Sequence, residues 1–124
     1  MLRAMNAELP PHLTAVFHPT ADAPVRAALV AGACGNVGFG KAGQFLRLLS
    51  KYDIPVIALD LSPSVKDVPE KLRAAFAKKF SPEQIDAMLE KLVVVQGTLD
   101  DVPATLPLGF VFEAIPERLD IKRP

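Results

Sequence analysis

The sequence predicts an α/β domain with an incomplete, doubly wound parallel sheet, and two observations support this prediction. Continuous apolar runs of strand length recur along the chain, which is typical of strands covered on both faces. Amphipathic segments of helical periodicity separate them, and this alternation indicates parallel strands joined by crossovers. We expect about four core strands, in the spatial order 3-2-1-4 when numbered along the chain. A chain of 124 residues is long enough for one such domain with its own core.

Composition narrows the possible partners. Hydrophobic residues make up 50% of the chain, and 14 basic residues balance 14 acidic ones, so we expect no nucleic acid or anionic membrane as partner. No apolar run approaches the roughly 20 residues that span a bilayer, and the first residues lack the apolar core of a signal peptide, which predicts a cytoplasmic protein. Cys34 is the only cysteine, so no internal disulfide is expected, and His12 and His18 do not complete a zinc site with it.

Residues 1–24 are predicted to be a proline-rich leader, followed by the partial domain at residues 25–124. The prolines of the leader are Pro10, Pro11, Pro19 and Pro24. Between them, LTAVFH at residues 13–18 has the length of a short strand, which we interpret as a possible extra strand at the edge of the sheet. The two histidines of the leader are expected to be surface residues.

The first half of the domain has the pattern of a βαβ unit. RAALVA at residues 26–31 predicts a buried strand, and PVIALD at residues 55–60 predicts a second one. An amphipathic helix is expected between them from Phe39 onward. Its apolar positions are Phe39, Ala42, Phe45, Leu46 and Leu49.

Two more helices are expected before the third strand. Asp67 could cap the first of them, because Glu70 follows three residues later as in a capping box. Ser81 is predicted to cap the second, with Pro82 in its first turn and Gln84 completing a capping box.

The remaining elements follow these helices. Residues 92–97, LVVVQG, predict the third strand, and residues 110–113 the fourth. Pro116 and Glu117 then suit the first turn of a further helix.

The turn after the first strand is rich in glycine. Gly32, Gly35 and Gly38 have the spacing G-x-x-G-x-x-G, close to the dinucleotide-binding pattern G-x-G-x-x-G, with Cys34 in the place of the second glycine. Backbone amides and the positive end of the helix dipole converge at such a turn, where a pyrophosphate can approach. The residues expected to hold it are Gly32, Gly35, Asn36, Val37 and Gly38. A turn needed only for close packing of helix on strand is the alternative, and Cys34 is either a reactive thiol at a helix N-terminus or a small buried filler.

Asp60 closes the second predicted strand, 22 residues beyond Gly38. A carboxylate at this position can accept both hydroxyls of an adenosine ribose and would repel a 2′-phosphate, which favours NAD over NADP as cofactor. An ordinary solvated residue at the end of a strand is the alternative. Together with the glycine turn, Asp60 predicts a Rossmann-like fold.

Several segments resemble the NAD-binding domain of the 3-hydroxyacyl-CoA dehydrogenase family. These are LDLSP, FSPEQIDAMLEKL, GTLDDV and, most diagnostic, FVFEAIPERLDIKR, and the resemblance covers residues 25–123. It implies that Asp60 binds the adenosine ribose and that Ala114, Glu117 and Lys122 line the nicotinamide half of the cofactor. Glu117 could equally be an ordinary first-turn helix residue, and Lys122 a solvated surface charge.

The chain departs from that family in two ways. Its glycine turn resembles that of extended short-chain dehydrogenases as much as that of the acyl-CoA enzymes, and the distance from the turn to Asp60 is about one helical turn longer. The family's catalytic residues, a His paired with a Glu and assisted by Ser and Asn, lie downstream of the fourth strand, so we expect no catalytic residue in this chain.

Two functions are consistent with these features. The first is the cofactor half of an NAD-dependent 3-hydroxyacyl-CoA dehydrogenase of fatty acid metabolism, completed by a catalytic half from another chain. The second is a non-catalytic domain that senses NAD or another adenine nucleotide, or that binds a protein. A third possibility, a short-chain epimerase-like or reductase-like fragment, would explain the glycine turn but not the segment FVFEAIPERLDIKR.

The fourth strand is expected to form an open edge of the sheet. Its apolar residues, and the one that follows, are Phe110, Val111, Phe112 and Ile115. Because an uncovered edge strand invites pairing, we expect a homodimer or a protein partner at this edge.

Overall fold

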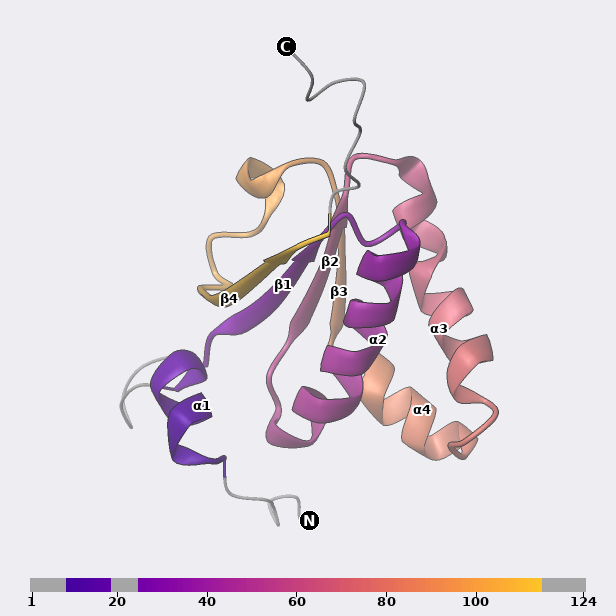
Figure 1. Ribbon diagram of the computed structural model, residues 1–124, viewed down its shortest axis with the longest axis horizontal. Coiled ribbons are helices and arrows are strands. Elements are labelled where there is room, and N and C mark those ends of the chain that lie inside the picture. The colour runs from indigo at the N-terminus through magenta and orange to yellow at the C-terminus, as the bar shows by residue number, and fades with distance from the viewer. Residues whose placement is uncertain (1–8, 19–24, 115–124) are drawn as a thin grey trace.

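The computed structural model describes residues 9–18 and 25–114 (Figure 1). In chain order the elements are α1 (Pro11–Phe17), β1 (Ala27–Ala31), α2 (Asn36–Leu49), η2 (Ser50–Tyr52), β2 (Val56–Asp60), η3 (Pro63–Asp67), α3 (Val68–Phe76), α4 (Pro82–Leu89), β3 (Leu92–Gln96), η4 (Leu99–Asp101) and β4 (Leu108–Glu113), where η marks a short 3-10 helix. The strands form one all-parallel sheet in the order β3-β2-β1-β4. The predicted fold class and strand order are therefore confirmed.

One face of the sheet is covered by the long helices. Figure 1 shows α2, α3 and α4 together on one side of the strands. Ala28 and Val30 of β1 are fully buried on this side, where α2 contributes Ala42 and Leu46 to the same core. α2 begins at Asn36, three residues before the expected start at Phe39, because Gly35 takes the extended backbone of an N-cap and the turn residues after it are already helical.

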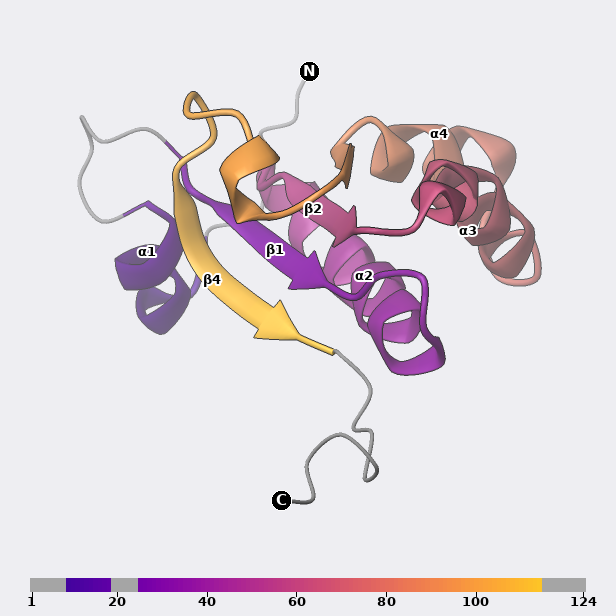
Figure 2. The same ribbon diagram turned by 90° about the horizontal axis from the view of Figure 1, so that it is seen from above.

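The opposite face has a thinner cover. Its buried residues are Ala27, Leu29, Ile57, Leu59 and Val95. Val102 and Leu106, from the segment that carries η4 and leads to β4, pack against them. Figure 2 shows η4 on the side of the sheet away from α2. In the described residues no longer helix covers this face, so the double winding is incomplete, as expected.

The expected extra strand at residues 13–18 is wrong, because this stretch forms the helix α1. Pro11 occupies its first turn, where a missing N–H costs nothing. Leu13, Val16 and Phe17 recur at helical spacing and pack into the core beneath α2. Strand alternation would instead have turned Val16 away from Leu13 and Phe17. The described part of the leader therefore belongs to the core of the sheet domain.

The two predicted capping boxes have different outcomes. At Ser81, the Oγ accepts from the N–H of Gln84 at 3.2 Å and the Gln84 Oε1 accepts from the N–H of Ser81 at 2.8 Å, so this box is confirmed. At Asp67 the side chain makes no cap. Asp67 already has helical backbone angles as the last residue of η3, so its carboxylate cannot take the position of an N-cap, and this expectation is wrong.

β4 carries a bulge that decides which of its side chains face the helices. Ala27 of β1 pairs with Leu108, whereas Ala28 pairs with Phe110, so the pairing skips Gly109. Beyond the bulge, Phe110 and Phe112 turn to the helical face and pack edge-on against Phe45 of α2, with ring centroids 5.7 and 6.1 Å away.

The fourth strand is the edge of the sheet, as expected, but part of its apolar surface is covered by its own chain. Phe112 is partly buried, whereas Phe110 and Val111 remain 44% and 43% exposed. Ile115 lies outside the described residues. Only Phe110 and Val111 therefore still offer a partner substantial apolar surface in the described part of this strand.

Candidate functional site

The glycine turn contains three glycines, Gly32, Gly35 and Gly38, and each has a different structural role. Gly32 has a φ of 82°, in the left-handed region that favours glycine, and this lets the chain leave β1 in a tight turn. Gly38 lies in the first turns of α2, where an added Cβ would overlap the carbonyl group of Gly32. Gly35 is the N-cap, and its N–H donates to the Gly32 carbonyl at 3.2 Å. Gly32 and Gly38 are therefore required by the backbone itself.

The N-terminus of α2 presents free backbone donors beside this turn. No side chain caps it, and its first turn contains no acidic residue. The first-turn residues Asn36 and Val37 are exposed, with Val37 at 61%. A helix end of this kind attracts an anion, because its unpaired N–H groups and the helix dipole act together.

Asp60 ties the glycine turn to the end of β2. Its Oδ2 accepts from the backbone N–H of Cys34 at 2.8 Å, and its Oδ1 accepts from the N–H of Ser62 at 3.0 Å. Partial burial by itself would raise the pKa of Asp60, but the hydrogen bonds from Ser62 and Cys34 outweigh burial and hold this pKa below its ordinary value. Each carboxylate oxygen keeps further lone-pair capacity, so Asp60 remains able to accept ligand hydroxyls.

A cavity of about 450 Å³ lies at the carboxyl ends of the strands. It is lined by Ala31, Gly32, Gly35, Leu59, Asp60, Leu61, Gly97, Thr98, Leu99 and Glu113. In open parallel sheets, ligands bind at the carboxyl ends of the strands, at the point where the strand order reverses. Here this point is beside β1, which has β2 on one side and β4 on the other. The volume is typical of small-molecule sites. The cavity therefore brings three of the predicted residues, Gly32, Gly35 and Asp60, to one site.

No residue in the part of this site that follows β3 was predicted as a site residue from the sequence. Gly97 has a φ of 141° and donates its N–H to the Asp60 carbonyl at 2.9 Å. Thr98 caps η4, and the Asp101 carboxylate accepts from the N–H of Thr98 in return at 2.8 Å. The spacing of Thr98 and Asp101 is that of a capping box, which was the signal available in the sequence.

The other predicted residues lie in different places. Val37 and Asn36 are on the exposed first turn of α2, and Gly38 is buried behind them. Ala114 directly follows β4 and donates its N–H to the Ala31 carbonyl at 2.8 Å, while its neighbour Glu113 lines the cavity. The structure does not describe two further predicted residues, Glu117 and Lys122.

Cys34 has the environment of an unreactive thiol. Burial raises its pKa, and the negative charge of Asp60 raises it further. Since the thiolate is the nucleophile, a raised pKa favours the alternative in which Cys34 is a small filler.

Lys71 brings a positive charge to the same turn. Together with Cys34 and Asn36 it lines a smaller cavity of about 170 Å³ beside the start of α2. Lys71 was not predicted as a site residue from the sequence.

Among the residues that the structure describes, no cluster of three His, Cys, Asp or Glu side chains could hold a metal ion, and no helix has the length and apolar character needed to cross a membrane. No protein-family model, curated protein or solved structure matches the chain. The resemblance to 3-hydroxyacyl-CoA dehydrogenases therefore stays a prediction.

Proposed function

We propose that the chain is a binding module for an adenine dinucleotide, with NAD the preferred ligand, in the cavity at the carboxyl ends of the strands. The observation that carries this proposal is the position of Asp60. The Asp60 carboxylate lies at the end of β2 and borders the cavity. It also accepts a hydrogen bond from the turn that precedes the uncapped N-terminus of α2. A carboxylate that could accept ribose hydroxyls is thus linked by one hydrogen bond to the turn before the backbone N–H groups that could donate to a phosphate.

The residues around the cavity suit the parts of such a ligand. Asp60 would accept the adenosine ribose hydroxyls, and the first-turn amides of α2 would hold the pyrophosphate, with Lys71 close to that helix end. Leu61 and Leu99, which are 70% and 52% exposed, line the same cavity and offer apolar surfaces for an adenine ring.

The charge of the cavity favours NAD over NADP. Asp60 and Glu113 both line it, and no Lys, Arg or His side chain does so among the described residues. A 2′-phosphate beside Asp60 would meet a like charge, and no described cation that lines the cavity would compensate it. We therefore expect weaker binding of NADP than of NAD.

The resemblance to 3-hydroxyacyl-CoA dehydrogenases supports a specific reaction for this module. In that reaction, the hydride on C3 of a 3-hydroxyacyl thioester passes to the nicotinamide, and the hydroxyl proton passes to a base, which leaves a 3-oxoacyl thioester. The described residues would supply cofactor contacts, whereas the base and the thioester site would come from another chain or segment. Fatty acid metabolism and a cytoplasmic location belong to the same proposal.

A second candidate is a non-catalytic nucleotide sensor or protein-interaction domain. Cys34 stands where the dinucleotide pattern has its second glycine, and Asp60 already accepts two backbone N–H groups. Both observations favour a site in which the Asp60 carboxylate partly serves to stabilise the turn.

Titration calorimetry with NAD tests the proposal on a matched pair of variants, Val37→Glu and Val37→Gln. Val37 is exposed at the first turn of α2, so neither change disturbs the core. The new carboxylate should weaken NAD binding by about tenfold through repulsion of the pyrophosphate, whereas the neutral amide should leave binding nearly unchanged. The carboxylate should not lower the melting temperature, because it suits a helix N-terminus.

Two results would contradict dinucleotide binding at this cavity. One is the absence of any NAD binding to the parent chain at millimolar concentration. The other is equal NAD affinity in the two Val37 variants. Binding of adenosine monophosphate as tight as that of NAD would instead favour the sensor, since the second half of the dinucleotide would then make no contact.

A further inference from the structure

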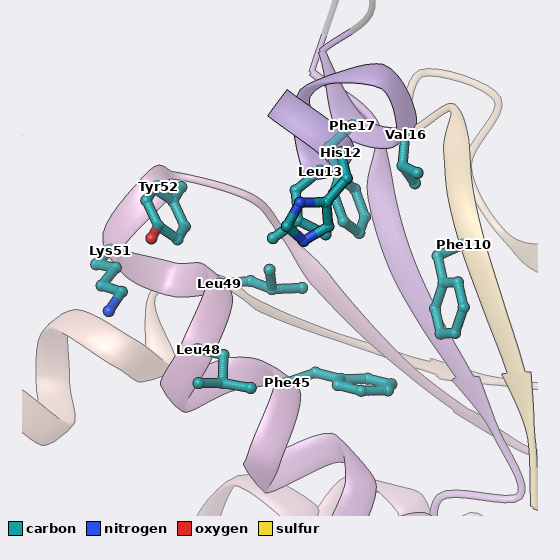
Figure 3. Close-up of a pocket in the computed structure, with 10 residues that line it drawn as sticks. All are labelled: His12, Leu13, Val16, Phe17, Phe45, Leu48, Leu49, Lys51, Tyr52 and Phe110. Carbon is teal, nitrogen blue, oxygen red and sulfur yellow. The ribbon is translucent and has the colours of Figure 1, made fainter. Parts of the chain in front are cut away.

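A second cavity lies at the other end of α2, and the dinucleotide proposal does not use it. Its volume is about 430 Å³, and its walls come from α1, the last turn of α2, η2 and the bulged part of β4 (Figure 3). It is lined by His12, Leu13, Val16, Phe17, Phe45, Leu48, Leu49, Lys51, Tyr52 and Phe110. None of these residues lines the cavity at the carboxyl ends of the strands. The two cavities are therefore separate sites.

The floor and walls of this second cavity are almost entirely apolar. Phe17 and Leu49 are buried at 3% and 6% exposure, and Phe45 is partly buried. Leu48 and Phe110 remain 47% and 44% exposed on the walls. A concave surface of aromatic and aliphatic side chains, of a volume typical of ligand sites, gains most from an apolar occupant that removes it from water.

The polar groups of the second cavity all suit an anion. They are the His12 imidazole, the Lys51 ammonium and the Tyr52 hydroxyl, and no Asp or Glu side chain lines the cavity among the described residues. The Lys51 Nζ lies 5.5 Å from the centre of the Tyr52 ring. Figure 3 shows Lys51 and Tyr52 along one side, with the His12 ring directed over the middle.

The nearest acidic side chain in sequence, Asp53, is engaged elsewhere. Its Oδ1 lies 3.4 Å from the Nζ of Lys91, the residue before β3, and Asp53 does not line the second cavity. Among the described residues that line the second cavity, the charged side chain is the cation Lys51, whereas the interior is apolar.

We propose that this second cavity binds an amphipathic monocarboxylate, with the alkyl or aryl part among Phe45, Leu49 and Phe110 and the carboxylate at Lys51. The cationic rim selects against a neutral or cationic ligand of the same shape, and the single ammonium matches a single carboxylate. The proposal stands whether or not the chain binds NAD, because the two sites share no residue.

Decanoate is the probe for this site, compared with decanol and decyltrimethylammonium, which have the same chain but a neutral and a cationic head. Binding is followed in the full chain by calorimetry and by amide chemical shifts. We expect decanoate to bind several-fold more tightly than either analogue, and to shift the amides of Tyr52 and Leu48 but not that of Gly35.

Two exposed lysines give a matched pair of variants. Lys51→Gln removes the ammonium from the rim, whereas Lys66→Gln removes one from η3, outside the cavity. The first should weaken decanoate binding about fivefold and the second should leave it unchanged. Leu48→Glu places a carboxylate on the exposed wall and should weaken binding further, with a melting temperature close to that of the parent.

Several outcomes would overturn the proposal. Equal affinity for decanoate and decanol, or equal affinity of the two lysine variants, would mean that the cationic rim does not select the ligand. If decanoate does not bind to the parent chain, the proposed carboxylate site is wrong. A parent chain that self-associates in light scattering, becomes monomeric with Leu48→Glu and does not bind decanoate would show that a second copy fills the cavity.

Discussion

At the scale of single residues, Asp60 has the most consequences, because it stabilises the glycine turn and borders the candidate site at once. Its two backbone hydrogen bonds hold its pKa below the ordinary value of 3.8. A carboxylate with a lowered pKa in the folded state contributes stability that is fully present above the pKa of the unfolded chain. This contribution is lost as the pH falls through the lower pKa of the folded chain.

We therefore expect a pH-dependent effect of Asp60→Asn. At pH 7 the variant should lose about 1 to 3 kcal/mol of unfolding free energy, because an amide replaces a charged acceptor of two N–H groups. The difference from the parent should shrink as the pH falls below about 5 and should vanish below the pKa of the folded carboxyl. Urea unfolding of both proteins across this range measures it. A difference that stays constant with pH would show that the charge of Asp60 does not stabilise the turn.

Two glycines of α2 give opposite predictions for the same substitution. Gly38→Ala should destabilise by about 2 kcal/mol or more, because its Cβ would overlap the Gly32 carbonyl, which is backbone that cannot move freely. Gly40→Ala should stabilise by roughly 0.5 to 1 kcal/mol, because nothing lies within 4 Å of the added methyl and alanine is the better helix former. Thermal or urea unfolding of the pair is the measurement. Equal effects of the two changes would contradict the close contact between α2 and the turn.

At the scale of elements, the contact between α1 and β4 depends on the bulge in β4. Gly109 lies in the bulge, and an added Cβ there would come 2.6 Å from the carbonyl O of Val16, near the end of α1. The glycine is therefore what lets the helix approach the strand. Phe17 then reaches the core, and α1 forms one wall of the second cavity.

Substitution at this bulge should separate α1 from β4. We expect Gly109→Ala to lower the unfolding free energy by about 1 to 3 kcal/mol, through the clash with Val16. Val111→Ala, in the same strand but 43% exposed, should change it by less than about 0.5 kcal/mol and serves as the control. Chemical denaturation checks both variants. Full stability of Gly109→Ala would mean that α1 does not pack on β4 in solution.

At the scale of the whole molecule, the open edge at β4 is the feature that most invites association. β4 pairs with β1 on one side only, and Val111 is exposed on the thinly covered face. An edge strand with unpaired backbone groups and an apolar side chain favours pairing with another strand. The partner expected from the sequence, a second copy or another protein, would cover this edge.

Light scattering at micromolar concentration should therefore detect a dimer of the isolated chain. Val111→Lys should shift it toward monomer, because a charge on an edge strand opposes pairing. Ala74→Lys, on the exposed side of α3, adds the same charge away from the edge and should leave the mass unchanged. A monodisperse monomer of the parent chain, or the same mass in both variants, would count against association at β4.

Features that depend on a local pattern were predictable from the amino-acid sequence. The buried strands were visible as apolar runs, and their alternation with helices predicted a parallel sheet, because parallel strands need crossovers of this kind. The strand order followed from the Rossmann-like interpretation of the glycine turn and Asp60. The capping box at Ser81 was equally readable, because all its groups lie within one helical turn.

Features that join distant segments of the chain depend on how those segments pack, and were not predictable from local patterns. The hydrogen bond from Cys34 to Asp60 spans 26 positions, and the bulge at Gly109 depends on how β4 aligns with β1. Helix α1 was missed because a short apolar stretch suits both a strand and a helix, and the core beneath α2 favours the helix. The second cavity is formed by side chains from elements far apart in the chain, so its existence followed from packing and not from any local motif.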